Sequence, residues 1–334
     1  MTAETTYDVL GIGNAIVDVM TRAEDDLLVA EGLAKGSMHL IDAKQAESLY
    51  SRVGPATESS GGSAGNTVAG LASLGGRAAF IGKVADDQLG DVYRHDMSAI
   101  GVGYRTPALS GGDPTGRSII LVTPDGERTM NTFLGAAQAL SPDDIDADLV
   151  GSAAITFLEG YLWDPPAAKD AFRRAATLAH EAGRKVALTL SDSFCVDRYR
   201  DEFLELIRTG AVDIVLANVS ELKSLYETAD LESGLRALRD DAALAAVTAS
   251  EDGSFVLSDA GVEQVEAARV EELVDATGAG DLYASGFLLG VARGMPLAAA
   301  ASLGSFAAAE VISHMGARPE VNLEEAARRA GFVL

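Results

Sequence analysis

A polar turn punctuated by glycines combines a carboxylate with a backbone suited to anions. The turn reads Asp275-Ala276-Thr277-Gly278-Ala279-Gly280-Asp281, and the apolar run that follows, 282–292, is long enough for three helical turns. Free amides at a helix N-terminus attract an anion. Asp281 would lie beside this anion, where electrostatics alone does not favour a carboxylate. Two interpretations stay open at this point: Asp281 caps the helix, or it is an acid–base group acting on a ligand at the glycines.

The N-terminal strand ends in residues that could contact a ligand. The apolar run 7–13 predicts a buried strand, and Asn14 and Asp18 follow its end. The carboxyl ends of strands are where open α/β sheets bind ligands. A dinucleotide fingerprint is disfavoured, because Ile16 stands where the third glycine of that motif is required.

A second glycine-rich stretch, 58–66, predicts a loop that opens onto a helix at 67–74. It is not a Walker P-loop, because no Gly-Lys-Ser/Thr ends it. Taken alone, the stretch is more typical of an ordinary strand-to-helix turn than of a ligand-binding loop.

The surrounding elements predict one large sheet and one small one. After residue 150 the chain alternates strands with helices, which predicts parallel strands covered by helices on both faces. Earlier, the segments 118–123 and 128–133 flank a Pro-Asp-Gly-Glu turn and predict a β-hairpin. We expect this hairpin to join residues 18–60 in a small sheet inserted into the larger domain.

The composition is that of a globular protein with an acidic surface. The 334 residues suffice for one large α/β domain or two smaller ones. With 50 acidic and 26 basic residues the net charge is −24, which argues against nucleic-acid binding. Cys195 is the only cysteine, so no disulfide framework and no thiolate metal cluster is expected. Residues 1–4 lack signal-peptide features and no apolar stretch suits a membrane span, so we expect a cytoplasmic protein without a membrane partner.

Three motifs in order resemble those of the ribokinase (PfkB-type) carbohydrate kinases. Segments 61–66 and 82–90 resemble the first family signature, and 275–281 with the helix behind it resembles the second. Asn218-Val219-Ser220-Glu221 matches the family's Asn-x-x-Glu motif. The resemblance implies an α/β fold, a doubly wound and mostly parallel sheet with helices on both faces, plus a small β lid. Residues 1–17, 61–114 and 134–334 would form the large domain, and residues 18–60 and 115–133 the lid.

The resemblance also implies ATP-dependent phosphorylation of a hydroxymethyl group. The amides of Gly278, Ala279 and Gly280 would hold the transferred phosphoryl group as an anion hole. Asp281 would accept the proton of the attacking hydroxyl as general base. Arg128 on the lid hairpin would reach the phosphates when the lid closes; the plainer alternative is a solvated surface arginine.

The family pattern assigns further residues to ligands. For the substrate it implies Asn14, Asp18, Met38, Gly62, Ser63, Gly65, Asn66, Leu134, Tyr161 and Phe194. For ATP it implies Asn218, Thr248, Ser250, Gly253, Gly278, Gly280, His314 and Gly316. Asn218 and Glu221, three apart on one helical face, would organise Mg²⁺ through its waters. Asp275 and Thr277 could line a monovalent-cation site for K⁺, although Glu320 stands where ribokinase-like members often have serine near that site.

Two aromatic residues point to the substrate. Tyr161 and Phe194 match positions at which the family's adenosine-kinase members supply rings against the base, and segment 128–137 resembles their lid segment. Core packing is the alternative for both rings. Ser63-Ala64-Gly65 replaces the lysine-bearing loop of ribokinase, which argues against free ribose.

The expected reaction is therefore phosphorylation of the 5′-hydroxyl of adenosine to give AMP and ADP. The alternative within the enzyme class is another nucleoside, such as inosine or guanosine, or a sugar: ribose, fructose or 2-keto-3-deoxygluconate. The alternative of another class is a catalytically silent nucleoside-binding protein. A monomer and a homodimer are both compatible with the sequence.

Overall fold

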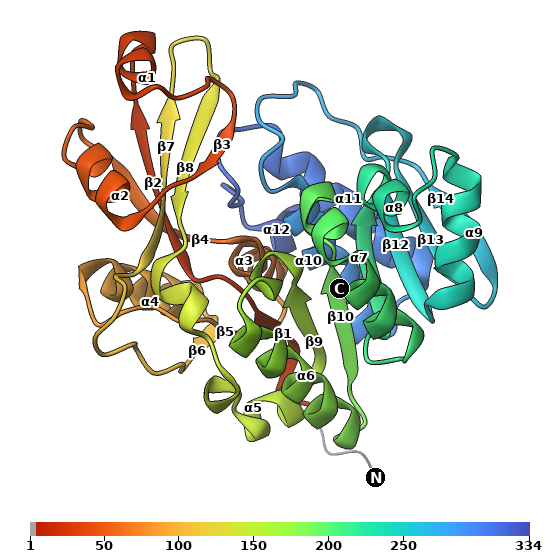
Figure 1. The fold of residues 1–334 in the computed structure, drawn as a ribbon. Coiled ribbons are helices and arrows are strands. Elements are labelled where there is room, and N and C mark those ends of the chain that lie inside the picture. The colour runs from red at the N-terminus through yellow and green to blue at the C-terminus, as the bar shows by residue number, and fades with distance from the viewer. Residues whose placement is uncertain (1–4) are drawn as a thin grey trace.

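The computed structural model describes residues 5–334 and contains two β-sheets of unequal size (Figure 1). The prediction that the N-terminus lacks signal-peptide features falls on residues 1–4, which lie outside this range. The large sheet has nine strands in the order β14-β13-β12-β11-β10-β9-β1-β5-β6. Its strands are β1 Tyr7–Ile12, β5 Ala78–Ile81, β6 Gly103–Tyr104, β9 Ala153–Glu159, β10 Lys185–Thr189, β11 Ile214–Asn218, β12 Leu244–Thr248, β13 Ser254–Ser258 and β14 Gly261–Val265.

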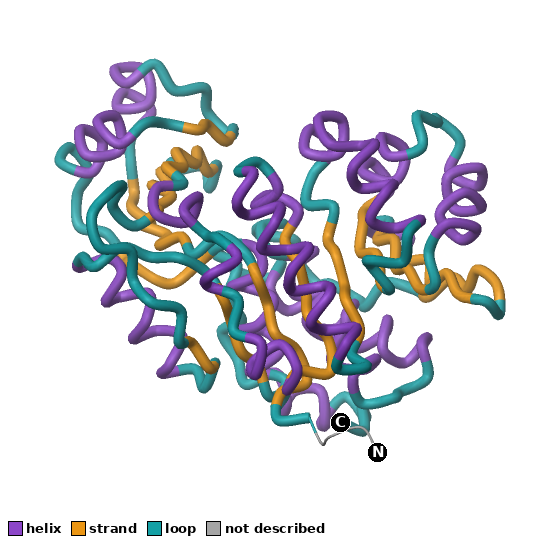
Figure 2. Tube along the Cα trace, turned by 60° about the horizontal axis from the view of Figure 1, so that its bottom comes forward, coloured by secondary structure: helices purple, strands orange, loops and turns teal. Residues whose placement is uncertain are grey.

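The pairing within the large sheet is parallel from β12 to β6, and only β13 and β14 run antiparallel to their neighbours. Alternate residues of β1 belong to two separate hydrophobic clusters, Val9 to one and Leu10 to the other. Each face of the sheet therefore has its own core, which requires helices on both sides. Figure 2 shows this arrangement, and the predicted doubly wound α/β fold is confirmed.

The helices divide between the two faces of the large sheet. α10 packs on α11 and α3, while α6 packs on β9 and β10 together with α5. The helices are α1 Asp25–Glu31, α2 Ala43–Tyr50, α3 Ser63–Ser73, α4 Gln88–Ala99, α5 Ala147–Ser152, α6 Pro166–Glu181, α7 Ser193–Arg208, α8 Val219–Leu225, α9 Leu231–Asp241, α10 Ala279–Ala292, α11 Leu297–Val311 and α12 Leu323–Arg329. Within the range that the structure covers, no helix is long and apolar enough to cross a membrane.

The small sheet has the order β3-β8-β7-β2-β4 and stands at the upper left of Figure 1. The predicted hairpin is present, because β7 and β8 pair antiparallel across the turn at 124–127. We refer to this sheet with α1 and α2 as the lid. Its strands are β2 Ile16–Arg22, β3 Met38–Leu40, β4 Thr57–Gly61, β7 Gly116–Val122 and β8 Arg128–Phe133.

The glycine-rich stretch 58–66 is not the loop that its composition predicts. Residues up to Gly61 form the end of β4, and α3 already begins at Ser63. Gly62 alone makes the turn, at a positive φ of 83°. A Cβ atom there would lie 2.2 Å from the Asn14 carbonyl oxygen, so only glycine fits. One residue thus joins the lid directly to a helix of the large domain.

Candidate active site

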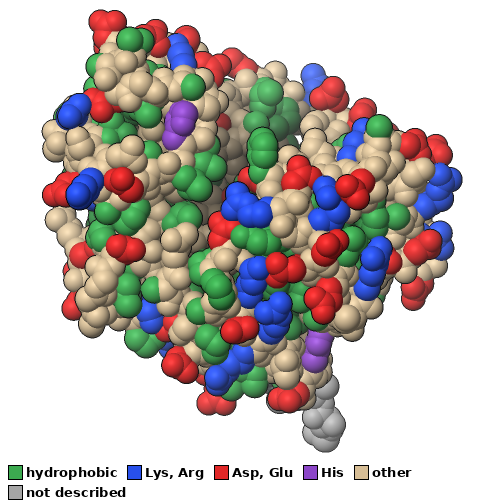
Figure 3. Space-filling model, viewed as in Figure 1, with side chains coloured by type: hydrophobic (Ala, Val, Ile, Leu, Met, Phe, Trp, Pro, Cys, Tyr) green, Lys and Arg blue, Asp and Glu red, His purple; other side chains and the backbone are tan. Residues whose placement is uncertain are grey.

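A cavity of about 930 Å³ lies between the lid and the carboxyl ends of the large sheet's strands. Figure 3 shows the corresponding hollow on one face of the molecule. The lid contributes Met38, His39, Leu40, Ser118, Ile120, Met130 and Thr132 to its lining. The large domain contributes the turn 276–281, the start of α3 and the ends of β9 to β12. The sequence motifs from distant parts of the chain therefore meet in one place, as expected for an open α/β sheet.

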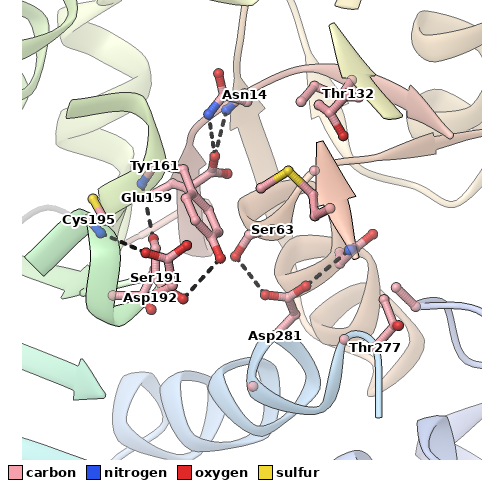
Figure 4. Close-up of a pocket in the computed structure, with 18 of the residues that line it drawn as sticks. Asn14, Ser63, Thr132, Glu159, Tyr161, Ser191, Asp192, Cys195, Thr277 and Asp281 are labelled. Carbon is pink, nitrogen blue, oxygen red and sulfur yellow. Dashed lines mark hydrogen bonds between the residues drawn. The ribbon is translucent and has the colours of Figure 1, made fainter. Parts of the chain in front are cut away.

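Asp281 faces this cavity from the first turn of α10. Its Oδ1 accepts a hydrogen bond from Ser63 Oγ at 2.6 Å, and its Oδ2 accepts one from Asn66 Nδ2 at 3.0 Å (Figure 4). Each oxygen keeps one acceptor site for a ligand. Burial raises the pKa of Asp281 to about 6, although Ser63, Asn66 and Arg318 oppose this shift. A carboxylate held in place with such a pKa is suited to accept a proton near neutral pH.

The interpretation of Asp281 as a helix cap is wrong. The N-cap residue of α10 is Gly278, in a left-handed conformation with φ 81°, and no side chain caps the helix. The helix begins three residues earlier than its apolar pattern predicts, because the left-handed glycine ends the preceding turn there. Asp281 is thus the third helical residue, and its side chain points to α3.

The turn before Asp281 offers two of the three predicted amide donors. In the described chain, the N–H groups of Gly278 and Gly280 have no partner, whereas Ala279 N donates to Ala276 O at 3.2 Å. Open space surrounds the position that a Cβ on Gly280 would occupy. A Cβ on Gly278 would lie 2.8 Å from that of Ala317, which explains glycine at this position. The helix N-terminus therefore presents a small anion site beside the carboxylate.

Asp18, on the lid strand β2, also lines the cavity. Its carboxylate makes no hydrogen bond to any residue that the structure describes, and its oxygens face the position of Gly61, where a Cβ would lie 2.4 Å away. Burial raises the pKa of Asp18 to about 6, against the influence of Arg318 and Arg128. An unpartnered carboxylate at a cavity wall is a ready acceptor for ligand hydroxyl groups.

Arg128 is neither solvated nor directed into the cavity. Its guanidinium forms an ion pair with the Asp275 carboxylate, and the exposed fractions of the two side chains are only 8% and 7%. Arg128 starts β8 on the lid, and Asp275 belongs to the turn before α10, so the pair joins lid and large domain. Asp275 also accepts hydrogen bonds from the backbone of Thr277 and Gly316 and from the Thr277 hydroxyl. Both carboxylate oxygens have donors, so the structure gives no support for a cation at Asp275.

Asn218 and Glu221 lie side by side at the start of α8, with Asn218 just before the helix and Glu221 in its first turn. Asn218 is the N-cap residue of α8, and the two side chains form a reciprocal capping box. Asn218 Nδ2 donates to Glu221 Oε1 at 2.5 Å, and both residues line the cavity. Burial raises the pKa of Glu221 to about 7. Each of the three side-chain oxygens accepts one hydrogen bond from the other residue and keeps a second lone pair, so the pair would suit a hydrated Mg²⁺ held through its waters.

Glu159 is a buried cavity residue to which the sequence assigned no role. It ends β9 and is 1% exposed. Its oxygens accept hydrogen bonds from Asn14 Nδ2 at 2.6 Å and from Ala64 N at 2.8 Å. Burial raises the pKa of Glu159 to about 7 despite these donors. Glu159 thereby fixes Asn14 and the start of α3. The sequence signal that could have identified Glu159 as a site residue is its position at the end of a strand.

The two predicted aromatic residues do not belong to the hydrophobic core. Tyr161 is 39% exposed and Phe194 is 77% exposed, and both line the cavity. The Tyr161 hydroxyl donates to Ser191 O at 3.1 Å, which fixes the ring against the cavity wall (Figure 4). Met38 on the lid strand β3 and Leu134 directly after β8 line the same cavity. Two aromatic and two apolar side chains therefore contribute to the lining of one cavity.

The residues predicted for ATP divide into two groups. Asn218, Thr248, Gly278 and Gly280 line the cavity. The other four lie outside the cavity lining: Ser250 and Gly253 in the turn between β12 and β13, and His314 and Gly316 after α11. Gly65, which was predicted for the substrate, is buried and also lies outside the lining. Their assignment to a ligand stays a prediction.

A doubly wound sheet, a lid over the strand ends and a carboxylate beside a helix N-terminus together suit a phosphotransferase that acts on hydroxyl groups. The comparison with known families agrees. The chain belongs to the pfkB family of carbohydrate kinases, whose model matches residues 27–323. The enzyme therefore phosphorylates a hydroxyl group of a sugar or nucleoside.

The similar proteins include both nucleoside and sugar kinases. The structure of adenosine kinase from Sinorhizobium meliloti is 57% identical with a TM-score of 0.91, covering 98% of this chain and all of that one. A probable sugar kinase from Rhizobium etli CFN 42 is 54% identical with a TM-score of 0.91, covering 98% of this chain and 99% of that one. An ATP-dependent ribose-1-phosphate kinase of Halopiger xanaduensis is 31% identical, covering 69% of this chain and 73% of its own.

Proposed function

We propose that the protein is an adenosine kinase, which transfers the γ-phosphoryl group of ATP to the 5′-hydroxyl of adenosine. The observation that carries the proposal is the pair of exposed rings, Tyr161 and Phe194, in the same cavity as Asp281. A purine offers a flat, extended π face that suits stacking on two such rings. The 57% identity to the adenosine kinase of Sinorhizobium meliloti supports the same substrate.

In this reaction each part of the cavity has one task. Asp281 accepts the proton of the 5′-hydroxyl, whose oxygen forms a bond to the γ-phosphorus as the bond to the β-phosphate oxygen breaks. The amides of Gly278 and Gly280 stabilise the charge on the transferred group. Asp18 accepts hydrogen bonds from the ribose hydroxyls, for which its carboxylate has no competing protein donor.

Two further groups supply positive charge to the phosphates of ATP. Arg128 exchanges Asp275 for the phosphate oxygens once ATP is bound, because both acceptors are anionic and Asp275 belongs to the turn that leads to the amides of Gly278 and Gly280. Mg²⁺, held through water by Asn218 and Glu221, supplies positive charge to the phosphates when bound. K⁺ activation, a cytoplasmic location and the monomer or homodimer stay predictions.

A sugar kinase is the second candidate. The similarity to the ribose-1-phosphate kinase and to the 5-dehydro-2-deoxygluconokinase of Shouchella clausii, at 28% identity, favours it. A catalytically silent nucleoside-binding protein has no use for the arrangement of Asp281, Ser63 and Asn66 around an open acceptor site.

Turnover of ATP with a substrate panel decides between the candidates. The panel contains adenosine, inosine, guanosine, ribose, fructose and 2-keto-3-deoxygluconate. We expect the highest kcat/KM with adenosine. 5′-Deoxyadenosine, which lacks the accepting hydroxyl, should bind as an inhibitor without turnover. Turnover of a sugar without turnover of adenosine would overturn the proposal.

A further inference from the structure

Arg318 is a partly buried arginine two residues beyond Gly316, and it follows the cavity residue Ala317. Its Nη2 donates to both the carbonyl and the hydroxyl oxygen of Ser60, at 2.7 and 3.0 Å. Its Nε is buried without a partner in the described range. A guanidinium that leaves a donor unused is poorly explained by hydrogen bonding alone. We therefore ask which groups use the positive charge of Arg318.

The Arg318 guanidinium contacts segments that neighbour both Asp18 and Asp281. Ser60 lies on β4, which pairs with β2, where Asp18 stands opposite Ser59. A Cβ on Gly65 would lie 3.7 Å from Arg318 Nη2, and Gly65 belongs to the first turn of α3. The same turn holds Ser63 and Asn66, the donors to Asp281. The guanidinium thus lies between the supports of Asp18 and those of Asp281.

The titratable groups around Arg318 come from three elements. Asp18 on β2, Asp96 and Tyr93 on α4, and Asp281 on α10 interact with it electrostatically. Asp96 itself accepts a hydrogen bond from Ser60 N at 2.8 Å. Arg318 is the one cation that opposes the burial-induced rise in the pKa of both Asp18 and Asp281; Arg128 acts only on Asp18.

We propose that Arg318 is a positioning residue of the active site, whose guanidinium supplies the positive charge shared by Asp18 and Asp281 and anchors β4 beneath them. It touches no substrate, since it lies outside the cavity lining. Without it, two carboxylates would face one cavity with no common counter-charge, and one of them would hold a proton near neutral pH. The inference rests on the proposed roles of Asp18 and Asp281.

The test compares Arg318→Met and Arg318→Lys with a matched control, Arg293→Met. Arg293 Nη2 likewise donates to a carbonyl, Gly75 O at 2.7 Å, and pairs with a carboxylate, Asp8, which is not in the cavity lining. The pH profile of kcat/KM is measured with the best substrate of the panel. Arg318→Met should move the acid limb upward by about one pH unit or more. Arg318→Lys should restore most of that shift, and Arg293→Met should cause none.

A second measurement does not depend on turnover. Thermal unfolding of each variant is recorded at pH 5.5 and pH 8. The loss in Tm caused by Arg318→Met should be larger at pH 8, where both carboxyl groups are ionised, and the loss caused by Arg293→Met should be the same at both values. Equal losses for Arg318→Met, or an unmoved acid limb, would overturn the inference. A substrate panel without turnover would instead refute the proposed function and leave the Tm comparison decisive for Arg318.

Discussion

Replacing Asp281 by asparagine should abolish turnover and at the same time stabilise the fold. The amide has nearly the shape of the carboxylate. Its oxygen can accept from Asn66 Nδ2, and its Nδ2 can donate to Ser63 Oγ, because a hydroxyl accepts as well as donates. The local geometry is therefore kept, and the substitution removes only the charge and the capacity to accept a proton.

The gain in stability follows from the pKa of Asp281. Burial raises it to about 6 from an ordinary value of 3.8, a difference that corresponds to roughly 3 kcal/mol. Because the folded-state pKa is the higher one, this contribution favours folding below pH 3.8 and is lost as the pH rises through 6. At pH 8 the ionised group thus lowers the free energy of unfolding. Allowing for weaker hydrogen bonds to the amide, we expect Asp281→Asn to gain about 1–3 kcal/mol, or roughly 2–6 °C in Tm.

The catalytic loss should be large. Loss of the general base should lower kcat by about 10²–10⁴-fold or more, with the Kd of adenosine unchanged within about threefold. The measurements are steady-state turnover, calorimetric titration and thermal unfolding at pH 4 and pH 8; the gain in Tm should appear only at pH 8.

Asp144→Asn is the matched control for this prediction. Asp144 is 8% exposed but pairs with Lys83, so its neutralisation leaves a buried ammonium group and should lower Tm. Retained turnover in Asp281→Asn, or a loss of stability at pH 8 like that of the control, would refute the reasoning.

Three further substitutions test the rest of the cavity. Phe194→Ala should weaken adenosine binding by about 1–2 kcal/mol, measured by calorimetry, without lowering Tm, because the ring is 77% exposed; a lower Tm with unchanged affinity would place its role in the fold. Arg128→Met should lower kcat by about 10²-fold or more while adenosine affinity persists; an unaltered kcat would confine Arg128 to its pair with Asp275. Asp18→Asn should weaken adenosine binding by about 1–3 kcal/mol, which raises KM by about 5- to 150-fold, and should reduce the discrimination against 2′-deoxyadenosine; a constant preference between these two nucleosides would contradict contact with the ribose hydroxyls.

The sequence alone determined the parts of this protein that depend on local order. The strand–helix alternation after residue 150 requires a sheet covered on both faces, and the structure has it. The turn 275–281 is also local, since its glycines and the apolar run behind it fix a helix N-terminus within a few residues. Its two interpretations were left open because capping and acid–base chemistry use the same residue type at nearly the same position.

Tertiary structure alone decided which side chains surround that turn. Ser63 and Asn66 lie more than 200 residues before Asp281 in the chain, and Arg128 lies 147 residues before Asp275. Arg318 and Glu159 gave no periodic signal, because a single polar residue at the end of a strand or loop acquires its role from neighbours on other elements. Contacts of this kind depend on how the lid and the large sheet pack, and periodicity along the chain carries no information about them.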